Sequence, residues 1–248
     1  MERLADVVSL PARRAAGTLA GGARRGYDTV SRSTTAYSLA ELDGWGRDPG
    51  LVDRVRSLSH LRWSVAVNGH RQLPERGGAL IVVNARRFAL APVFAALSIG
   101  GAVGRPVRFA GRPDIAPVGP LMQRLGGLLT RPDEITGALR AGELVVVGAE
   151  PTTHPRRVGH VDHRLVGAAV TAGSRVFPTA TASAPFRRSA RVEIGHEIRP
   201  NRRRRGPLTE LELADAVEST IQQLLDELGG PVTGTPLDWL PLSGMGGS

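Results

Sequence analysis

One stretch, residues 79–90, constrains the fold of this chain more than any other. Ala79 to Val83 is a continuous apolar run rich in β-branched residues, which is typical of a strand buried on both faces. Asn84 ends the run, two arginines follow, and residues 88–97 continue as an apolar helix. In α/β folds the loop at the carboxyl end of such a strand opens onto a crevice where ligands bind. The stretch therefore predicts an α/β domain with functional residues just after the strand.

The alternation of strands and helices continues through most of the chain. Further apolar strands are predicted at residues 63–67, 106–110, 143–149 and 175–182, with helical patterns between them. Residues 191–198 alternate apolar and polar side chains, so we expect an edge strand there. Residues 209–228 carry an apolar face at helical spacing, and Thr209 and Glu212 stand in the positions of a capping box. This order predicts a mixed, mostly parallel sheet flanked by helices.

Composition divides the chain into three parts. Residues 1–50 form a basic, weakly amphipathic segment that ends in a predicted linker at 44–50. Residues 51–228 carry the α/β pattern, and residues 229–248 form a tail rich in Gly and Pro. The basic segment could lie on an anionic membrane surface, and a loosely ordered, solvated N-terminus fits the same composition.

The charge of the chain favours an anionic partner. All 32 basic residues are arginine, against 23 acidic residues, and the net charge is +9. Arginine binds phosphate groups bidentately, so phospholipid headgroups, nucleic acid or a phosphorylated ligand would suit this surplus. Aromatic residues make up only 4% of the chain and are not interleaved with the arginines, so no nucleic acid partner is expected. There is no Cys, which excludes thiolate catalysis and Cys-based zinc sites.

The sequence predicts a cytoplasmic protein that is peripheral on the membrane. The first twenty residues contain acidic residues and arginines without an apolar core, so no signal peptide is predicted. The longest uncharged run, residues 88–104, is shorter than the about 20 residues that a spanning helix needs. There is no nucleotide-binding glycine loop and no Gly-x-Ser-x-Gly motif, and no cofactor is predicted.

Around the strand at 79–83 the sequence resembles the glycerolipid acyltransferase family, whose members turn lysophosphatidate into phosphatidate. The first motif of the family follows such a strand and reads Asn-His, four residues, then Asp. Asn84 is present here, but Ala85 stands at the His position and Leu90 at the Asp position. In the family the His is the general base on the acceptor hydroxyl, which attacks an acyl thioester, and the Asp orients the imidazole. The resemblance implies the fold of this family without its catalytic pair, so no catalytic residue is assigned.

Three further motifs of the family are present in part, and the resemblance extends in order over residues 50–228. Gly126 and Arg131 resemble the second motif, whose Arg grips the acceptor phosphate, with one residue fewer between them. Glu150 and Thr152 match two positions of the third motif. The strand at 176–178 matches the fourth, an apolar strand with a central Pro. The resemblance implies that Arg131, Glu150 and Thr152 bind substrate; for Arg131 and Glu150 the alternatives are a surface Arg and a buried, ion-paired Glu.

Two more groups of residues are candidates for the site. Arg86 and Arg87 stand beside a predicted helix N-terminus, where they would make a mouth that attracts anions, unless both point to solvent. His154, His160 and His163 follow the third motif, and the last two are spaced to share a helix face. They could supply a relocated general base or a metal site, or be surface histidines, and no metal site is assigned.

These observations lead to three hypotheses. The first is a catalytically impaired acyltransferase-family protein that binds a lysophospholipid and an acyl thioester, on coenzyme A or an acyl carrier, and has a lipid-binding or regulatory role. The second is an active acyltransferase with a relocated base. The third is a basic peripheral protein that holds an anionic membrane surface through residues 1–50 and 202–205.

Overall fold

The computed structural model describes residues 42–62, 64–85, 90–152, 154, 157–183, 189–199 and 206–228. The described residues from Asp43 onward belong to one compact unit. The predicted basic segment up to residue 41, the tail at 229–248, the arginines at 202–205 and the pair Arg86 and Arg87 lie outside the described residues.

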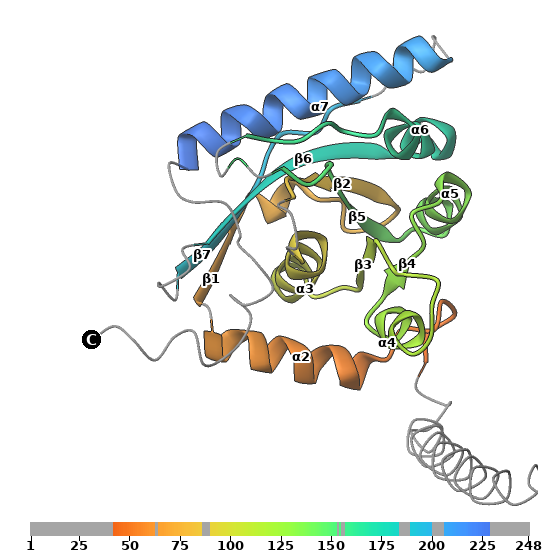
Figure 1. Ribbon diagram of the computed structural model, residues 1–248, viewed down its shortest axis with the longest axis vertical. Coiled ribbons are helices and arrows are strands. Elements are labelled where there is room, and N and C mark those ends of the chain that lie inside the picture. Colours follow the sequence, from red (N-terminus) through yellow and green to blue (C-terminus); the bar gives the residue numbers. More distant parts are fainter. Residues whose placement is uncertain are drawn as a thin grey trace, which may run out of the picture. The chain divides into compact units, whose positions relative to one another are not determined.

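Within the described residues a seven-stranded mixed sheet forms the middle layer of this unit (Figure 1). The strand order is β1-β7-β6-β2-β5-β3-β4. Five neighbouring strands, from β6 to β4, are parallel, whereas β7 runs antiparallel to β6 and β1 runs parallel to β7. The strands are β1 (Ser64–Asn68), β2 (Ala79–Val83), β3 (Val107–Ala110), β4 (Gly127–Leu128), β5 (Leu144–Gly148), β6 (Arg175–Ser183) and β7 (Ser189–Ile194). The predicted mixed, mostly parallel sheet is confirmed.

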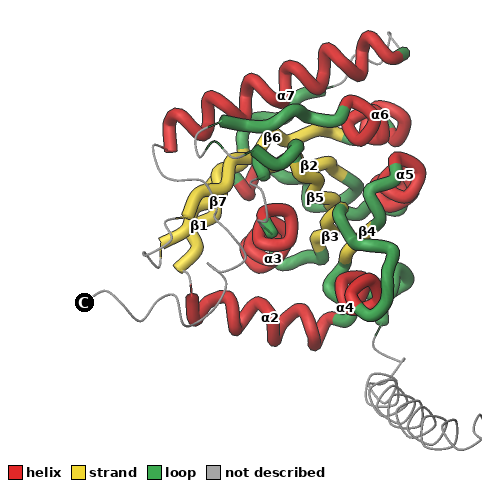
Figure 2. Tube along the Cα trace, viewed as in Figure 1, coloured by secondary structure: helices red, strands yellow, loops and turns green. Residues whose placement is uncertain are grey.

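Helices cover both faces of the sheet (Figure 2). One face carries α5 (Pro132–Arg140), α6 (His163–Ala172) and α7 (Pro207–Leu228). The other carries α3 (Ala91–Val103), and α2 (Pro49–Arg62) contacts α3 and β1. Two short elements, η2 (His70–Gln72) and α4 (Val118–Arg124), join strands on this side. No described helix is both long enough and apolar enough to span a membrane.

The sheet has a hydrophobic core on each of its two faces, and strand β2 contributes side chains to both. All five of its side chains are buried. Leu80 and Val82 belong to the core under α5, α6 and α7. Ala79, Ile81 and Val83 belong to the core under α3. Because neighbouring side chains of a strand point to opposite faces, a strand covered on both sides must be apolar throughout, as this sequence predicts.

Two local predictions were wrong. The alternating strand is β7, and it lies between β1 and β6 rather than at an edge. It alternates because Ala190, Val192 and Ile194 pack into the core under α3, while the side chains on its other face are not fully buried. The last helix begins at Pro207, so Thr209 is a buried residue of its first turn and not the cap of a capping box.

The predicted linker at 44–50 is held firmly to the sheet unit. Asp48 caps α2 by accepting a hydrogen bond from the Leu51 N–H, and its carboxylate forms an ion pair with Arg124. Asp43 forms an ion pair with the buried Arg108 of β3 at 2.7 Å. The hydrogen bond from Leu51 is the main cause that lowers the pKa of Asp48, against the effect of burial, and the ion pair with Arg124 adds to it. These acidic residues therefore fix the entry into α2.

Candidate functional site

The carboxyl ends of four parallel strands meet along one edge of the sheet, which we call the carboxyl edge. In spatial order these strands are β2, β5, β3 and β4. The segments that leave them begin at Asn84, Ala149, Gly111 and Leu129. Because neighbouring strands are about 4.8 Å apart, residues that leave β2 and β5 are direct neighbours, and those of β4 lie about 10 Å from those of β5. The topology thus brings the predicted motif residues to one edge.

Asn84 fastens β2 to β6 at this edge. Its side chain is fully buried, accepts a hydrogen bond from the Thr181 N–H at 2.7 Å, and donates one to the Thr181 carbonyl at 3.1 Å. The Thr181 hydroxyl contacts the same Asn84 oxygen at 3.2 Å. A side-chain amide has both a donor and an acceptor, so Asn84 can take the place of the backbone hydrogen bonds between β2 and β6 at the point where β2 ends. Asn84 is therefore a structural residue that fixes the position of Ala85.

Ala85 occupies the place where the resemblance expects a general base. It is only 5% exposed, and its carbonyl accepts a hydrogen bond from the Thr152 N–H at 3.3 Å. Leu90 is the N-cap residue of α3 and makes no side-chain capping bond. Neither side chain can accept or orient a proton. The two described positions, 85 and 90, therefore offer no group for general-base chemistry.

Thr152 and Glu150 leave β5 next to Ala85 and connect it to the following loop. Besides its bond to Ala85, Thr152 accepts a hydrogen bond from the His154 N–H at 3.1 Å through its hydroxyl. Glu150 is exposed, and its N–H donates to the His160 carbonyl at 2.7 Å. The structure thus brings Thr152 and Ala85 into contact and places Glu150 one strand away from β2. The alternative of a buried, ion-paired Glu150 is wrong, because this side chain faces solvent.

Arg131 lies farther along the carboxyl edge, at the N-cap of α5 after β4. Its side chain is 67% exposed and approaches the Asp114 carboxylate at 3.6 Å. A pair this exposed contributes little to stability, so the guanidinium can exchange Asp114 for another anion at small cost.

Arg112 is a candidate that the sequence did not single out. It follows β3, between the exits of β5 and β4, and its side chain is 15% exposed. Its Nε is buried without a hydrogen-bond partner in the described part of the chain, and its nearest carboxylate, that of Glu134, is 3.9 Å away. A guanidinium has donors suited to a bidentate anion, and this one has capacity left. Its position directly after an apolar strand is the signal that could have identified it.

His154 and His160 lie beside α7, on the face of the sheet opposite α3. His154 lines a cavity of about 840 Å³ between the loop and α7. The Nδ1 of His160 is 3.4 Å from the Glu218 carboxylate of α7. His163 is the first residue of α6, and Asp162 caps this helix, so His160 lies before it; the predicted shared helix face is wrong. Among the residues that the structure describes, no three His, Asp or Glu side chains form a group that could hold a metal ion.

The fold of this chain has a counterpart among solved structures. It is similar to the crystal structure of the 1-acyl-sn-glycerophosphate (LPA) acyltransferase PlsC from Thermotoga maritima, with a TM-score of 0.53 and 17% sequence identity. The match covers 74% of this chain and 81% of PlsC. No family model matches the sequence, and no curated protein sequence matches it significantly. At this level of sequence identity the similarity shows that the two proteins share a fold.

Proposed function

We propose that this protein binds a lysophosphatidate-like lipid and an acyl thioester at the carboxyl edge, and that it lacks effective acyl-transfer catalysis. The observation that carries this proposal is Ala85, buried and hydrogen-bonded to Thr152 at the exit of β2, where a general base would have to stand. The fold and the arrangement of the strand exits support a lipid ligand. The absence of a proton acceptor at residues 85 and 90 supports a binding or regulatory role.

Two guanidinium groups suit the phosphate of such a lipid. Arg131 and Arg112 leave the neighbouring strands β4 and β3, and each lies near a single carboxylate, at 3.6 and 3.9 Å. The first turn of α3 contains no acidic residue, so the positive end of its dipole adds to the attraction for an anion.

Replacement of Arg131 tests the binding site. We expect Arg131→Ala to weaken binding of lysophosphatidate about tenfold or more, because a charge-assisted hydrogen bond contributes roughly 1.5 to 3 kcal/mol. Isothermal titration calorimetry with short-chain lysophosphatidate measures this. Arg140→Ala is the matched control, since Arg140 is an exposed arginine at the other end of α5. Equal affinity of the Arg131→Ala and wild-type proteins would return Arg131 to the role of a surface residue.

A second candidate is an active acyltransferase with a relocated base. The contact between His160 and Glu218 favours it, because an imidazole next to a carboxylate is the arrangement that a general base requires. The bond between the Glu150 N–H and the His160 carbonyl links this residue to the carboxyl edge. The His160 side chain contacts α7 on the opposite face from α3, which is why we rank this candidate second.

The surplus of arginine over acidic residues in the whole chain supports a location on the cytoplasmic side, peripheral on an anionic membrane. We expect the protein to co-sediment with vesicles that contain anionic phospholipid and not with neutral vesicles, since its net charge is +9. Raising the salt concentration should release it, because exposed charges are screened within about 10 Å at 0.1 M salt. Equal binding to neutral vesicles would contradict the electrostatic account.

A further inference from the structure

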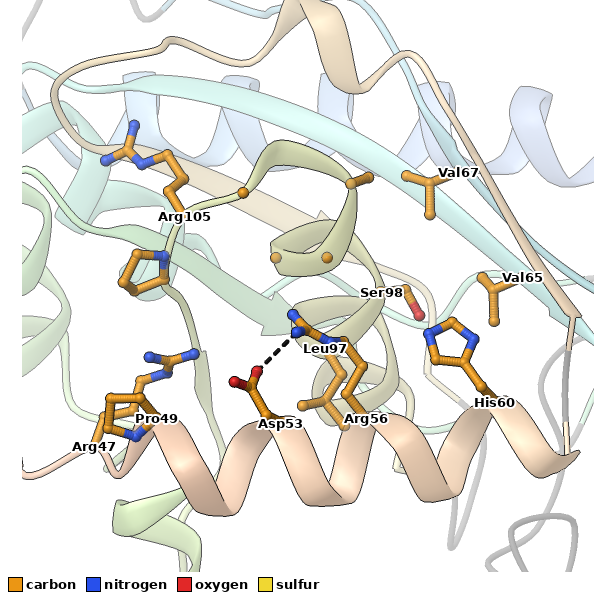
Figure 3. A pocket seen from close by; sticks show the side chains of 15 residues that line it. Arg47, Pro49, Asp53, Arg56, His60, Val65, Val67, Leu97, Ser98 and Arg105 are labelled. Carbon is orange, nitrogen blue, oxygen red and sulfur yellow. Dashed lines mark hydrogen bonds and ion pairs between the residues drawn. The ribbon is translucent and has the colours of Figure 1, made fainter. Parts of the chain in front are cut away.

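A second cavity, of about 710 Å³, lies away from the carboxyl edge (Figure 3). Its walls are α2, strand β1 and the second half of α3, together with the residues that lead into β3. Because α3 runs from the end of β2 to the start of β3, this half of the helix lies near the amino ends of the parallel strands. The residues of the acyltransferase motifs do not line this cavity.

Cationic side chains dominate the polar part of the cavity. Arg47 and Arg56 line it together with the imidazole of His60, and Figure 3 shows the three side chains extending from α2 and from the residues just before this helix. Among the lining residues the acidic one is Asp53, which pairs with Arg56 at 2.7 Å. Arg105 also lines the cavity, but its guanidinium donates hydrogen bonds to the Pro74, Glu75 and Gly142 carbonyls, so it has a structural role.

Arg47 is held in place with unused hydrogen-bonding capacity. Its Nε is buried and has no hydrogen-bond partner among the described residues. Gly126 packs so closely that an added Cβ would lie 3.3 Å from the Arg47 Cδ. Burial lowers the pKa of the Arg47 guanidinium, and the carboxylates of Asp43 and Asp53 partly offset this. A bound anion would stabilise this charge further.

The remaining wall is apolar and open. Val65 and Val67 of β1 face the cavity together with Leu97 of α3. Glycines of α3 line the cavity beside these residues. A side chain at Gly101 would crowd Arg56, because an added Cβ would lie 3.4 Å from the Arg56 Cδ. The cavity is far larger than a phosphate ion and falls in the range of roughly 300 to 1,000 Å³ that is typical of small-molecule sites. Its ligand should therefore have an apolar body as well as a charge.

We propose that this cavity binds an organic phosphate monoester, with the phosphate between Arg47 and Arg56 and the apolar part against Val65, Val67 and Leu97. Two guanidinium groups match a phosphate dianion better than a carboxylate, because each can donate two parallel hydrogen bonds to it. The Asp53 carboxylate pairs with Arg56 and therefore competes with the ligand for this guanidinium. The site is separate from the carboxyl edge and does not depend on the function proposed for that edge.

Calorimetric titration of the full chain with phenyl phosphate at low salt tests this site. We expect phenyl phosphate to bind more tightly than inorganic phosphate, which lacks the apolar body, and than benzoate, which lacks the second negative charge. The double variant Arg47→Gln with Arg56→Gln should weaken phenyl phosphate binding about tenfold or more. Arg71→Gln is the matched control, because it removes an equal charge from an exposed residue outside the cavity, and it should bind as the wild type does.

Two further variants distinguish binding in this cavity from a general effect of charge or of damage to the fold. Asp53→Asn should tighten phenyl phosphate binding about threefold or more, since it releases Arg56, and a damaged fold would not produce this gain. Arg140→Ala, at an exposed residue that does not line this cavity, should leave the affinity unchanged. The proposal is overturned if the wild type does not bind phenyl phosphate, if Asp53→Asn does not tighten binding, or if Arg140→Ala or Arg71→Gln weakens it as much as the double variant.

Discussion

Purified wild-type protein is expected to transfer acyl groups from acyl thioesters to lysophosphatidate at or near the background rate. Ala85 cannot accept a proton and Leu90 cannot orient an imidazole, and general-base assistance typically contributes roughly 10² to 10⁴-fold. A radiometric or thiol-release assay with several acyl donors and lysophospholipids measures this directly. Binding of the same lipids by calorimetry shows that the protein in the assay is folded and competent.

Placing the catalytic pair of the acyltransferase motif at residues 85 and 90 should produce activity only when both residues are present. Ala85→His alone should recover little, because an imidazole without a partner carboxylate has no fixed tautomer. Ala85→His with Leu90→Asp should exceed the background rate. An Asp at residue 90 would also cap α3, which offsets part of the cost of placing a carboxylate there.

The outcome that contradicts the impaired-enzyme proposal is clear turnover by the wild type. If that turnover disappears in His160→Ala, the base has moved to the pair formed by His160 and Glu218. If it disappears in His154→Ala or His163→Ala instead, another histidine of the same loop is the base. His196→Ala is the matched control, because His196 is exposed and follows β7, away from this loop.

Removal of the Arg108 side chain should produce the largest loss of stability. Arg108 is 1% exposed, forms ion pairs with Asp43 at 2.7 Å and Glu143 at 3.2 Å, and its guanidinium carbon lies 5.7 Å from the centre of the Trp45 ring. Breaking a buried ion pair by removing one partner costs about 3 to 5 kcal/mol. Urea unfolding followed by circular dichroism should show this loss in Arg108→Ala. Arg56→Ala, which breaks an exposed pair, should cost less than about 1 kcal/mol.

The ion pairs of Arg108 with Asp43 and Glu143 also make the free energy of unfolding depend on pH. Burial alone would raise the pKa of Asp43, but hydrogen bonds from the Arg47 and Trp45 N–H groups and from Arg108 more than offset this, so its pKa is lowered. A carboxyl group with a lowered pKa in the folded state contributes stability above its unfolded pKa of about 3.9, and this contribution is lost as the pH falls through the folded pKa. The free energy of unfolding of the wild type should therefore fall at acidic pH. The fall should be smaller in Asp43→Asn, and an identical pH profile would contradict this role of Asp43.

Much of the fold could be predicted from local pattern. The run from Ala79 to Val83 had to be a strand covered on both faces, because a strand with one wet face would alternate. The apolar run at 143–149 predicted β5 for the same reason, and the apolar residues at helical spacing in 209–228 predicted α7. The position of β7 could not be predicted in this way. The alternating pattern of β7 shows only that one of its faces is incompletely covered. An inner strand next to the edge strand can have such a face just as an edge strand can, so the pattern does not distinguish the two positions.

The sequence by itself determined that the exit of β2 lacks a proton acceptor, because Ala85 and Leu90 have no titratable group in any conformation. Only the tertiary structure decided which cations are available for an anion. Arg131 and Arg112 leave neighbouring strands because β4 pairs with β3, and Arg47 and Arg56 line one cavity because α2 packs on α3. Nothing in the sequence distinguishes Arg108 from these arginines, yet its side chain is buried and forms ion pairs with Asp43 and Glu143. Local pattern predicts burial along one element, whereas the partners of a long charged side chain depend on which elements meet.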